Sequence, residues 1–201
     1  MRIIILIFFF LFQNSANASI KSNIIENLKL IENLKFNFVQ KIGKKSEKGE
    51  CIIAYPKKIF CKYKDRYNKI LVSNGKSLVI NSDRSNQYYR YQLEKTPLNL
   101  ILDKKFLINK MNDSENFSKS FNNYSFKFIY EQTTLIVHFD KNTLNLIGWT
   151  TNDIYQNQVE TKISNVEKNL MINSNIFKIQ NYINIFFFYF KTQPMHQLNL
   201  I

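Results

Sequence analysis

Histidine, cysteine, glycine and proline are all scarce in this sequence. With 4 Gly and 3 Pro in 201 residues, the chain is neither collagen-like nor of low complexity. Its 2 His and 2 Cys leave little material for a zinc site or for general base catalysis. A Gly-rich phosphate loop, a G-x-S-x-G elbow and an H-E-x-x-H motif are all missing from the sequence. We therefore predict no enzyme, no catalytic residue, no metal and no cofactor.

The rest of the composition is typical of one folded domain. Hydrophobic residues make up 45% of the chain, and a domain of this size buries roughly 70% of the surface its unfolded chain exposes. The net charge of +13 comes mostly from lysines, which are spread along the whole chain. Nucleic-acid binders instead gather basic residues on one face, so we predict no nucleic-acid partner.

The first 18 residues are typical of a secretory signal peptide. A positive start at Met1 and Arg2 precedes an apolar run of ten over 3–12, and Ala16 and Ala18 form an A-x-A cleavage site. The alternative is an uncleaved anchor, for which this run is too short. The mature chain is thus expected to begin at Ser19, outside the cytoplasm.

Hydrophobic spacing predicts a helix followed by many short strands. Apolar residues recur at helical spacing over 20–32, and alternation begins at Phe36. Thr96 and Pro97 indicate a helix start, with Thr96 as the N-cap, and 104–123 looks polar and loop-rich. Strands are expected in one antiparallel sheet or open barrel over 36–42, 48–54, 58–64, 70–73, 76–81, 88–92, 124–130, 133–140, 144–152 and 158–166.

The two cysteines lie on either side of the turn that contains Pro56. In a hairpin about this proline, Cys51 and Cys61 face each other directly, at a separation close to disulfide reach. An exported chain allows them to pair, and two buried free thiols are the alternative. Neither His138 nor His196 has the spacing of a zinc ligand. The lysines on the other side of the second arm predict that its cysteine face points inward.

The order of these motifs resembles the periplasmic outer-membrane lipoprotein carrier family (LolA type). The resemblance covers roughly residues 20–180, and the segments 72–76 and 95–102 are its most specific parts. It implies an unclosed antiparallel β-barrel covered by a lid of α-helices, an α+β fold that is mainly β. Together with the signal peptide over 1–18, it predicts a carrier domain over 19–180, and it leaves a C-terminal extension of unknown role over 181–201.

The resemblance also implies a site. The sheet side of an acyl-chain cavity would consist of Phe36, Phe38, Ile53, Ile59 and Tyr63, and the lid of Leu98, Ile101 and Leu102. For each residue, ordinary core packing is the alternative.

Two positions depart from the family pattern. The family commonly has an arginine latch before the hairpin proline, where this chain has Tyr55; tyrosine brings one hydroxyl instead of five donors. A family aromatic position is Cys61, whose cross-strand neighbour is Cys51, and we predict that a disulfide replaces the packing contact.

The function implied is that of a periplasmic chaperone that carries acylated lipoproteins from the inner to the outer membrane. Its expected partners are lipoproteins, an inner-membrane lipoprotein-releasing ABC transporter and an outer-membrane acceptor, and it is expected to act as a monomer. Two alternatives are an open-barrel periplasmic carrier or sensor of another lipid, and a non-enzymatic envelope scaffold.

Overall fold

The computed structural model describes residues 13–84, 87–113, 117–153 and 157–183. In these ranges the strands are β1 (Asn33–Ile42), β2 (Lys45–Ala54), β3 (Lys58–Tyr63), β4 (Ile70–Asn74), β5 (Ser77–Ser82), β6 (Gln87–Gln92), β7 (Phe117–Lys119), β8 (Asn123–Tyr130), β9 (Thr133–Asp140), β10 (Leu146–Asn152) and β11 (Gln158–Lys168). The helices are α2 (Gln13–Lys29), α3 (Leu98–Leu102) and α4 (Lys104–Asp113), with short 3-10 turns η1 (Leu93–Lys95), η2 (Ser174–Phe177) and η3 (Ile179–Tyr182).

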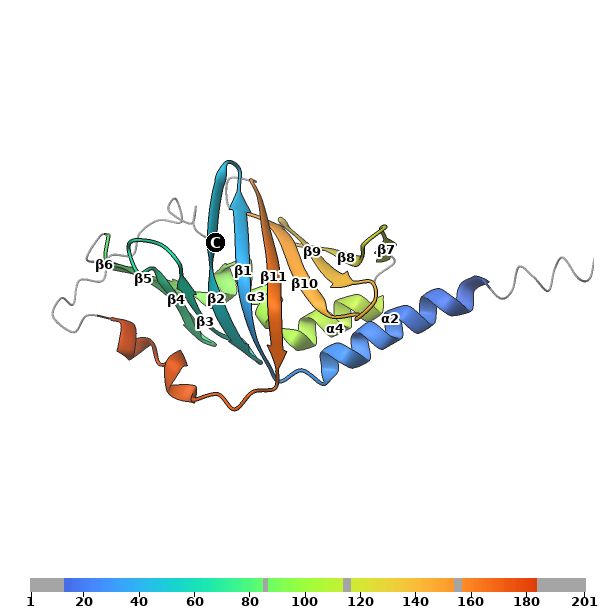
Figure 1. Cartoon of the computed structure of the whole chain (residues 1–201), viewed down its shortest axis with the longest axis horizontal. Coiled ribbons are helices and arrows are strands. Elements are labelled where there is room, and N and C mark those ends of the chain that lie inside the picture. Colours follow the sequence, from blue (N-terminus) through green and yellow to red (C-terminus); the bar gives the residue numbers. More distant parts are fainter. Residues whose placement is uncertain (1–12, 85–86, 114–116, 154–156, 184–201) are drawn as a thin grey trace, which may run out of the picture.

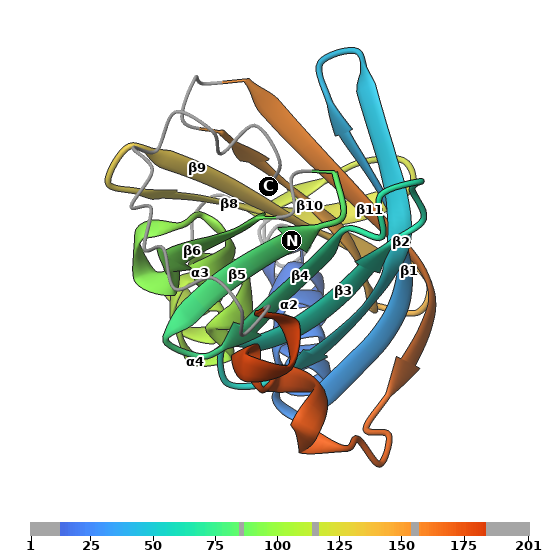
Figure 2. The same ribbon diagram turned by 90° about the vertical axis from the view of Figure 1, so that its left-hand side faces the viewer.

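The described strands form one antiparallel sheet in the order β6-β5-β4-β3-β2-β1-β11-β10-β9-β8-β7. The sheet is strongly curved (Figure 2). It does not close, because β6 and β7 lie at its two edges and do not pair with each other. The predicted fold is therefore confirmed. The central pairing of β1 with β11 joins strands far apart in the sequence, and it unites the two halves of the sheet.

The helices α2, α3 and α4 cover the concave face of the sheet (Figure 1). Alternation sends every second residue of β1 inward, and Phe36 and Phe38 are buried there while Val39 is exposed. The buried side of α2, with Ile24 and Leu28, packs into the same core.

The outer face of β3–β5 carries the C-terminal turns η2 and η3. Val72 and Val79 point outward and pack with Ile179 in a second apolar cluster, to which Phe60 and Tyr182 contribute rings 5.4 Å apart. Figure 2 shows this segment in front of β3 and β4, with α2 behind the sheet. This half of the sheet is thus covered on both faces.

Two local predictions were wrong. The stretch expected to be loop-rich contains α4, whose buried residues Leu107 and Met111 stand one turn apart. Thr96 is not a side-chain cap: its hydroxyl donates to the backbone oxygen of Leu93 at 2.7 Å, and Pro97 occupies the N-cap position of α3.

The predicted signal peptide lies largely outside the described residues. The helix α2 begins at Gln13, so the expected cleavage before Ser19 would fall within its first turns and leave its buried residues from Ile24 onward in place. It ends at Lys29, three residues earlier than predicted. Within the described part of the chain, the helices lack the length and apolar character that a membrane crossing requires.

Candidate acyl-chain cavity

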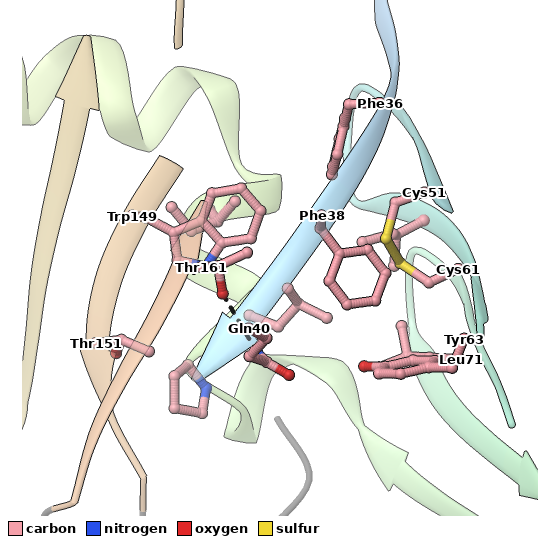
Figure 3. Close-up of a pocket in the computed structure, with 14 residues that line it drawn as sticks. Phe36, Phe38, Gln40, Cys51, Cys61, Tyr63, Leu71, Trp149, Thr151 and Thr161 are labelled. Carbon is pink, nitrogen blue, oxygen red and sulfur yellow. Dashed lines mark hydrogen bonds between the residues drawn. A yellow bond between two sulfur atoms is a disulfide. The ribbon is translucent and has the colours of Figure 1, made fainter. Parts of the chain in front are cut away.

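An apolar cavity lies between the concave sheet and the helix α3 (Figure 3). Its empty volume is about 560 Å³ when the space at the open mouth is included. The enclosed part is narrow, because the centres of water molecules could occupy only about 40 Å³ of it. The lid therefore sits close to the sheet. The lining residues are Phe36, Phe38, Gln40, Cys51, Ile59, Cys61, Tyr63, Leu71, Pro97, Leu98, Ile101, Trp149, Thr151 and Thr161.

Aromatic rings from β1, β3 and β10 form much of the sheet side. The ring of Phe36 meets Trp149 edge to face at 6.3 Å, and Phe38 meets Tyr63 in the same way at 5.0 Å. Gly49 pairs with both Phe38 and Tyr63 across its neighbouring strands. A Cβ atom at this glycine would collide with the ring of Phe38 and with the backbone of β3, so the lack of a side chain lets the two rings approach each other.

The two cysteines form a disulfide in the wall of the cavity. Cys51 and Cys61 are directly opposed in the β2–β3 ladder, with Cα atoms 4.1 Å apart, and their sulfur atoms are bonded. The hairpin geometry expected from the sequence is therefore present. This cross-link ties together the two strands that lead into the turn at Pro56.

One end of the cavity is polar. Gln40 continues the inward face of β1, and its Nε2 donates to Thr161 Oγ1 of β11 at 3.3 Å. Thr151 of β10 lines the same region, and all three side chains are buried. Among the described residues, neither Gln40 Oε1 nor Thr151 Oγ1 has a hydrogen-bond partner.

The lid is joined to the β2–β3 turn through Lys57. Its backbone N–H donates to the Leu102 oxygen at 2.9 Å, and its Nζ lies 3.2 Å from Asp103 Oδ2. Lys104 holds α4 against the end of α2, because its Nζ donates to the backbone oxygens of Lys29 and Ile31. The lid is thus tied down at its C-terminal end by a few polar contacts.

Tyr55, the candidate latch, contacts the lid region differently. Its hydroxyl is buried without a hydrogen-bond partner among the described residues, and burial raises its pKa. The ring lies 5.6 Å from Lys104 Nζ, and its side chain packs against the main core. A latch made by Tyr55 stays a prediction, while Lys57 supplies the polar contacts seen at this turn.

A partly buried ion pair lies against the ring of Tyr63. Lys69 Nζ lies 2.6 Å from both carboxylate oxygens of Glu47 and 3.7 Å from the centre of the Tyr63 ring. Burial lowers the pKa of Lys69, and the Glu47 carboxylate opposes this shift. Burial raises the pKa of the Tyr63 hydroxyl, so the ring lining the cavity is a neutral phenol.

The structure places the predicted site residues in two groups. Six of them line the cavity: Phe36, Phe38, Ile59, Tyr63, Leu98 and Ile101. Ile53 and Leu102 are fully buried in the core but are not among the lining residues. Sequence reasoning missed the polar end and Trp149; the alternation that selected Phe36 and Phe38 continues to Gln40, which was the available signal.

The part of the chain that the structure describes contains no group of three or more His, Cys, Asp or Glu side chains placed to hold a metal ion. His138 lies on the outer face of β9, with Nδ1 2.9 Å from Ser125 Oγ and Nε2 3.0 Å from Thr150 Oγ1. Burial lowers its pKa. These two hydroxyl contacts hold the His138 ring in position on the outer face of the sheet, away from the cavity.

An unclosed sheet, a lid of helices and an apolar cavity between them together define a half-barrel of the ligand-binding class. The chain belongs to the LolA family: the family described as outer membrane lipoprotein carrier protein LolA matches residues 29–180. The resemblance seen in the sequence is therefore confirmed. No curated protein matches the chain.

Several solved structures are similar to this chain at low identity. An uncharacterized conserved protein from Thermus thermophilus is 8% identical, with a TM-score of 0.47 over 80% of this chain and 92% of that one. A LolA superfamily protein from Nitrosomonas europaea is 8% identical, with a TM-score of 0.42 over 78% and 96%. The Mycobacterium tuberculosis lipoprotein LppX is 9% identical, with a TM-score of 0.39 over 76% and 96%.

Proposed function

We propose that this protein is a periplasmic carrier that binds the acyl chains of lipoproteins in the cavity and takes them from the inner to the outer membrane. The observation that carries the proposal is the apolar cavity shared by sheet and lid in a member of the LolA family. The predicted signal peptide supports the location. The proposed partners are acylated cargo, an inner-membrane lipoprotein-releasing ABC transporter and an outer-membrane acceptor.

The energetics of an acyl chain explain why a carrier is needed. Burying each CH₂ group is worth about 0.8 kcal/mol, so a sixteen-carbon chain left in water costs on the order of 12 kcal/mol. The cavity is too narrow for such a chain in the arrangement seen here. Loading therefore requires α3 to move away from the sheet, which breaks the contacts of Lys57 with Leu102 and Asp103.

The test is to isolate the protein from the periplasm without detergent and to identify bound molecules by mass spectrometry. We expect a lipoprotein or its acyl chains on the native protein and on Ile129→Asp, which changes a side chain that is 67% exposed. Ile101→Asp, at a lid residue that is 2% exposed, should abolish loading. Leu98→Trp, which fills the cavity without adding charge, should reduce loading in a folded protein.

The result also separates the alternatives. Recovery of a glycolipid or phospholipid in place of lipoprotein would support a carrier or sensor of another lipid. An empty protein that binds no apolar probe would contradict the carrier proposal and favour a scaffold. Normal loading of both Ile101→Asp and Leu98→Trp would refute the assignment of the cavity.

A further inference from the structure

The polar end of the cavity carries an oxygen atom to which no described part of the chain donates a hydrogen bond. Gln40 is 7% exposed and donates to Thr161 through Nε2, while its Oε1 has no partner among the described residues. Figure 3 shows this oxygen turned away from Thr161. Thr151 of β10 is also 7% exposed, and no described residue forms a hydrogen bond with its Oγ1. Buried polar atoms in folded proteins are nearly always hydrogen-bonded, so these two need an explanation.

We infer that this end of the cavity binds the polar linkage of an acylated ligand, and that Gln40 Oε1 accepts a hydrogen bond from an amide N–H of that ligand. The inference rests on the proposed function, since it concerns the same cavity. It adds that the cavity selects amide-linked over ester-linked acyl chains.

The chemistry of the carbonyl oxygen determines what it can bind. An amide oxygen only accepts hydrogen bonds, so its partner must bring an N–H or O–H group. A hydrocarbon chain satisfies neither Gln40 nor Thr151. An ester linkage has only hydrogen-bond acceptors. The Thr151 hydroxyl could donate to one of them, but the ester has no N–H or O–H group to donate to Gln40 Oε1. An N-acyl amide supplies the missing donor directly next to its apolar chain.

The apolar lining around Gln40 increases the effect of this donor on ligand affinity. The remaining lining is almost entirely aliphatic and aromatic, and Trp149 lies opposite Thr161 in the β10–β11 ladder, beside the polar end (Figure 3). In so dry a wall, an unmade hydrogen bond is not replaced by one to bulk water. A ligand that satisfies the oxygen therefore binds more tightly than a matched ligand that leaves it unpaired.

A matched pair of probes tests the inference: N-methyldodecanamide and methyl dodecanoate, which differ only in an N–H replaced by oxygen. Both compete with Nile red for the cavity, and displacement gives their relative affinities. A purely apolar cavity favours the ester, because the amide loses more hydration. We expect the native protein to prefer the amide by about five- to tenfold, the size of one satisfied buried hydrogen bond.

The variant Gln40→Met should remove this preference and leave ester binding nearly unchanged. The control Gln92→Met alters an exposed glutamine on β6 and should keep the native ratio. In the native protein, an N-dodecanoyl tripeptide and N-dodecanoylethanolamine then distinguish a peptide from a lipid as the source of the amide. The probe that binds more tightly identifies which of these two classes of ligand the site recognises.

Two results would overturn the inference: a native protein that does not prefer the amide, or a Gln40→Met variant that keeps the preference. If both probes bind equally, the acyl-chain carrier proposal stands and only the role of Gln40 fails. If neither probe displaces Nile red, the carrier proposal fails as well.

Discussion

Replacing Lys57 by methionine should loosen the lid without disturbing the sheet. Its Nζ lies 3.2 Å from Asp103 Oδ2, and the two side chains are 34% and 27% exposed. For a pair so accessible to solvent, we expect a contribution of about 0.5–1 kcal/mol. The helix α4 keeps its own support in this variant, because Asp103 Oδ1 still accepts from the Phe106 N–H.

A loss of this size multiplies the open fraction of the lid by about two to five, since RT is about 0.59 kcal/mol. Hydrogen–deuterium exchange measured over residues 98–102 should become faster by this factor, while exchange in β1 and β11 stays as in the native protein. The matched control is Lys58→Met, at an exposed neighbour. Unchanged exchange in the lid would refute this role of the Lys57–Asp103 ion pair, and an equal increase in the sheet would point to general destabilisation.

Replacing Cys51 and Cys61 together by alanine should lower the free energy of unfolding by about 2–3 kcal/mol, because the disulfide closes a short loop; an unchanged midpoint in urea would contradict this. Gly49→Ala should lower the melting temperature, since the new Cβ collides with the backbone oxygen of Lys62; a native melting temperature would count against the close approach at this strand. Acidification from pH 7.5 to 5 should destabilise the protein partly through His138. Burial lowers its pKa from 6.5, so the unfolded state binds more protons below that pH. Thermal melts of His138→Gln should show a weaker pH dependence, and an identical slope would exclude this contribution.

Most strands could be predicted because alternation is a local property. The hairpin that brings Cys51 opposite Cys61 needed only the proline turn and the lysines of one arm. The pairing of β1 with β11 could not be derived from such patterns, because it depends on contacts such as Phe38 with Ile163 across most of the chain. The family resemblance predicted the unclosed barrel, but the order of its strands came from the structure.

The errors have local physical causes. The helix α4 has only four apolar residues, Phe106, Leu107, Ile108 and Met111, within a longer polar stretch, and its burial comes from packing beside α2. Threonine is a common N-cap residue, but the hydroxyl of Thr96 instead donates to the backbone oxygen of Leu93 in the preceding 3-10 turn. The polar end of the cavity was missed because Gln40, Thr151 and Thr161 resemble ordinary surface residues in sequence.

The C-terminal turns on β3–β5 give the sheet unequal thickness. That side has three layers, with the lid inside and η2 and η3 outside, and the disulfide stiffens it further. The opposite side, β8–β10, has no such outer layer among the described residues. Each packed layer adds resistance to bending, so the thinner wall that carries Trp149 and Thr151 should bend more easily than the side formed by β3–β5. The molecule would then have one flank that can adapt its shape and one flank that keeps it.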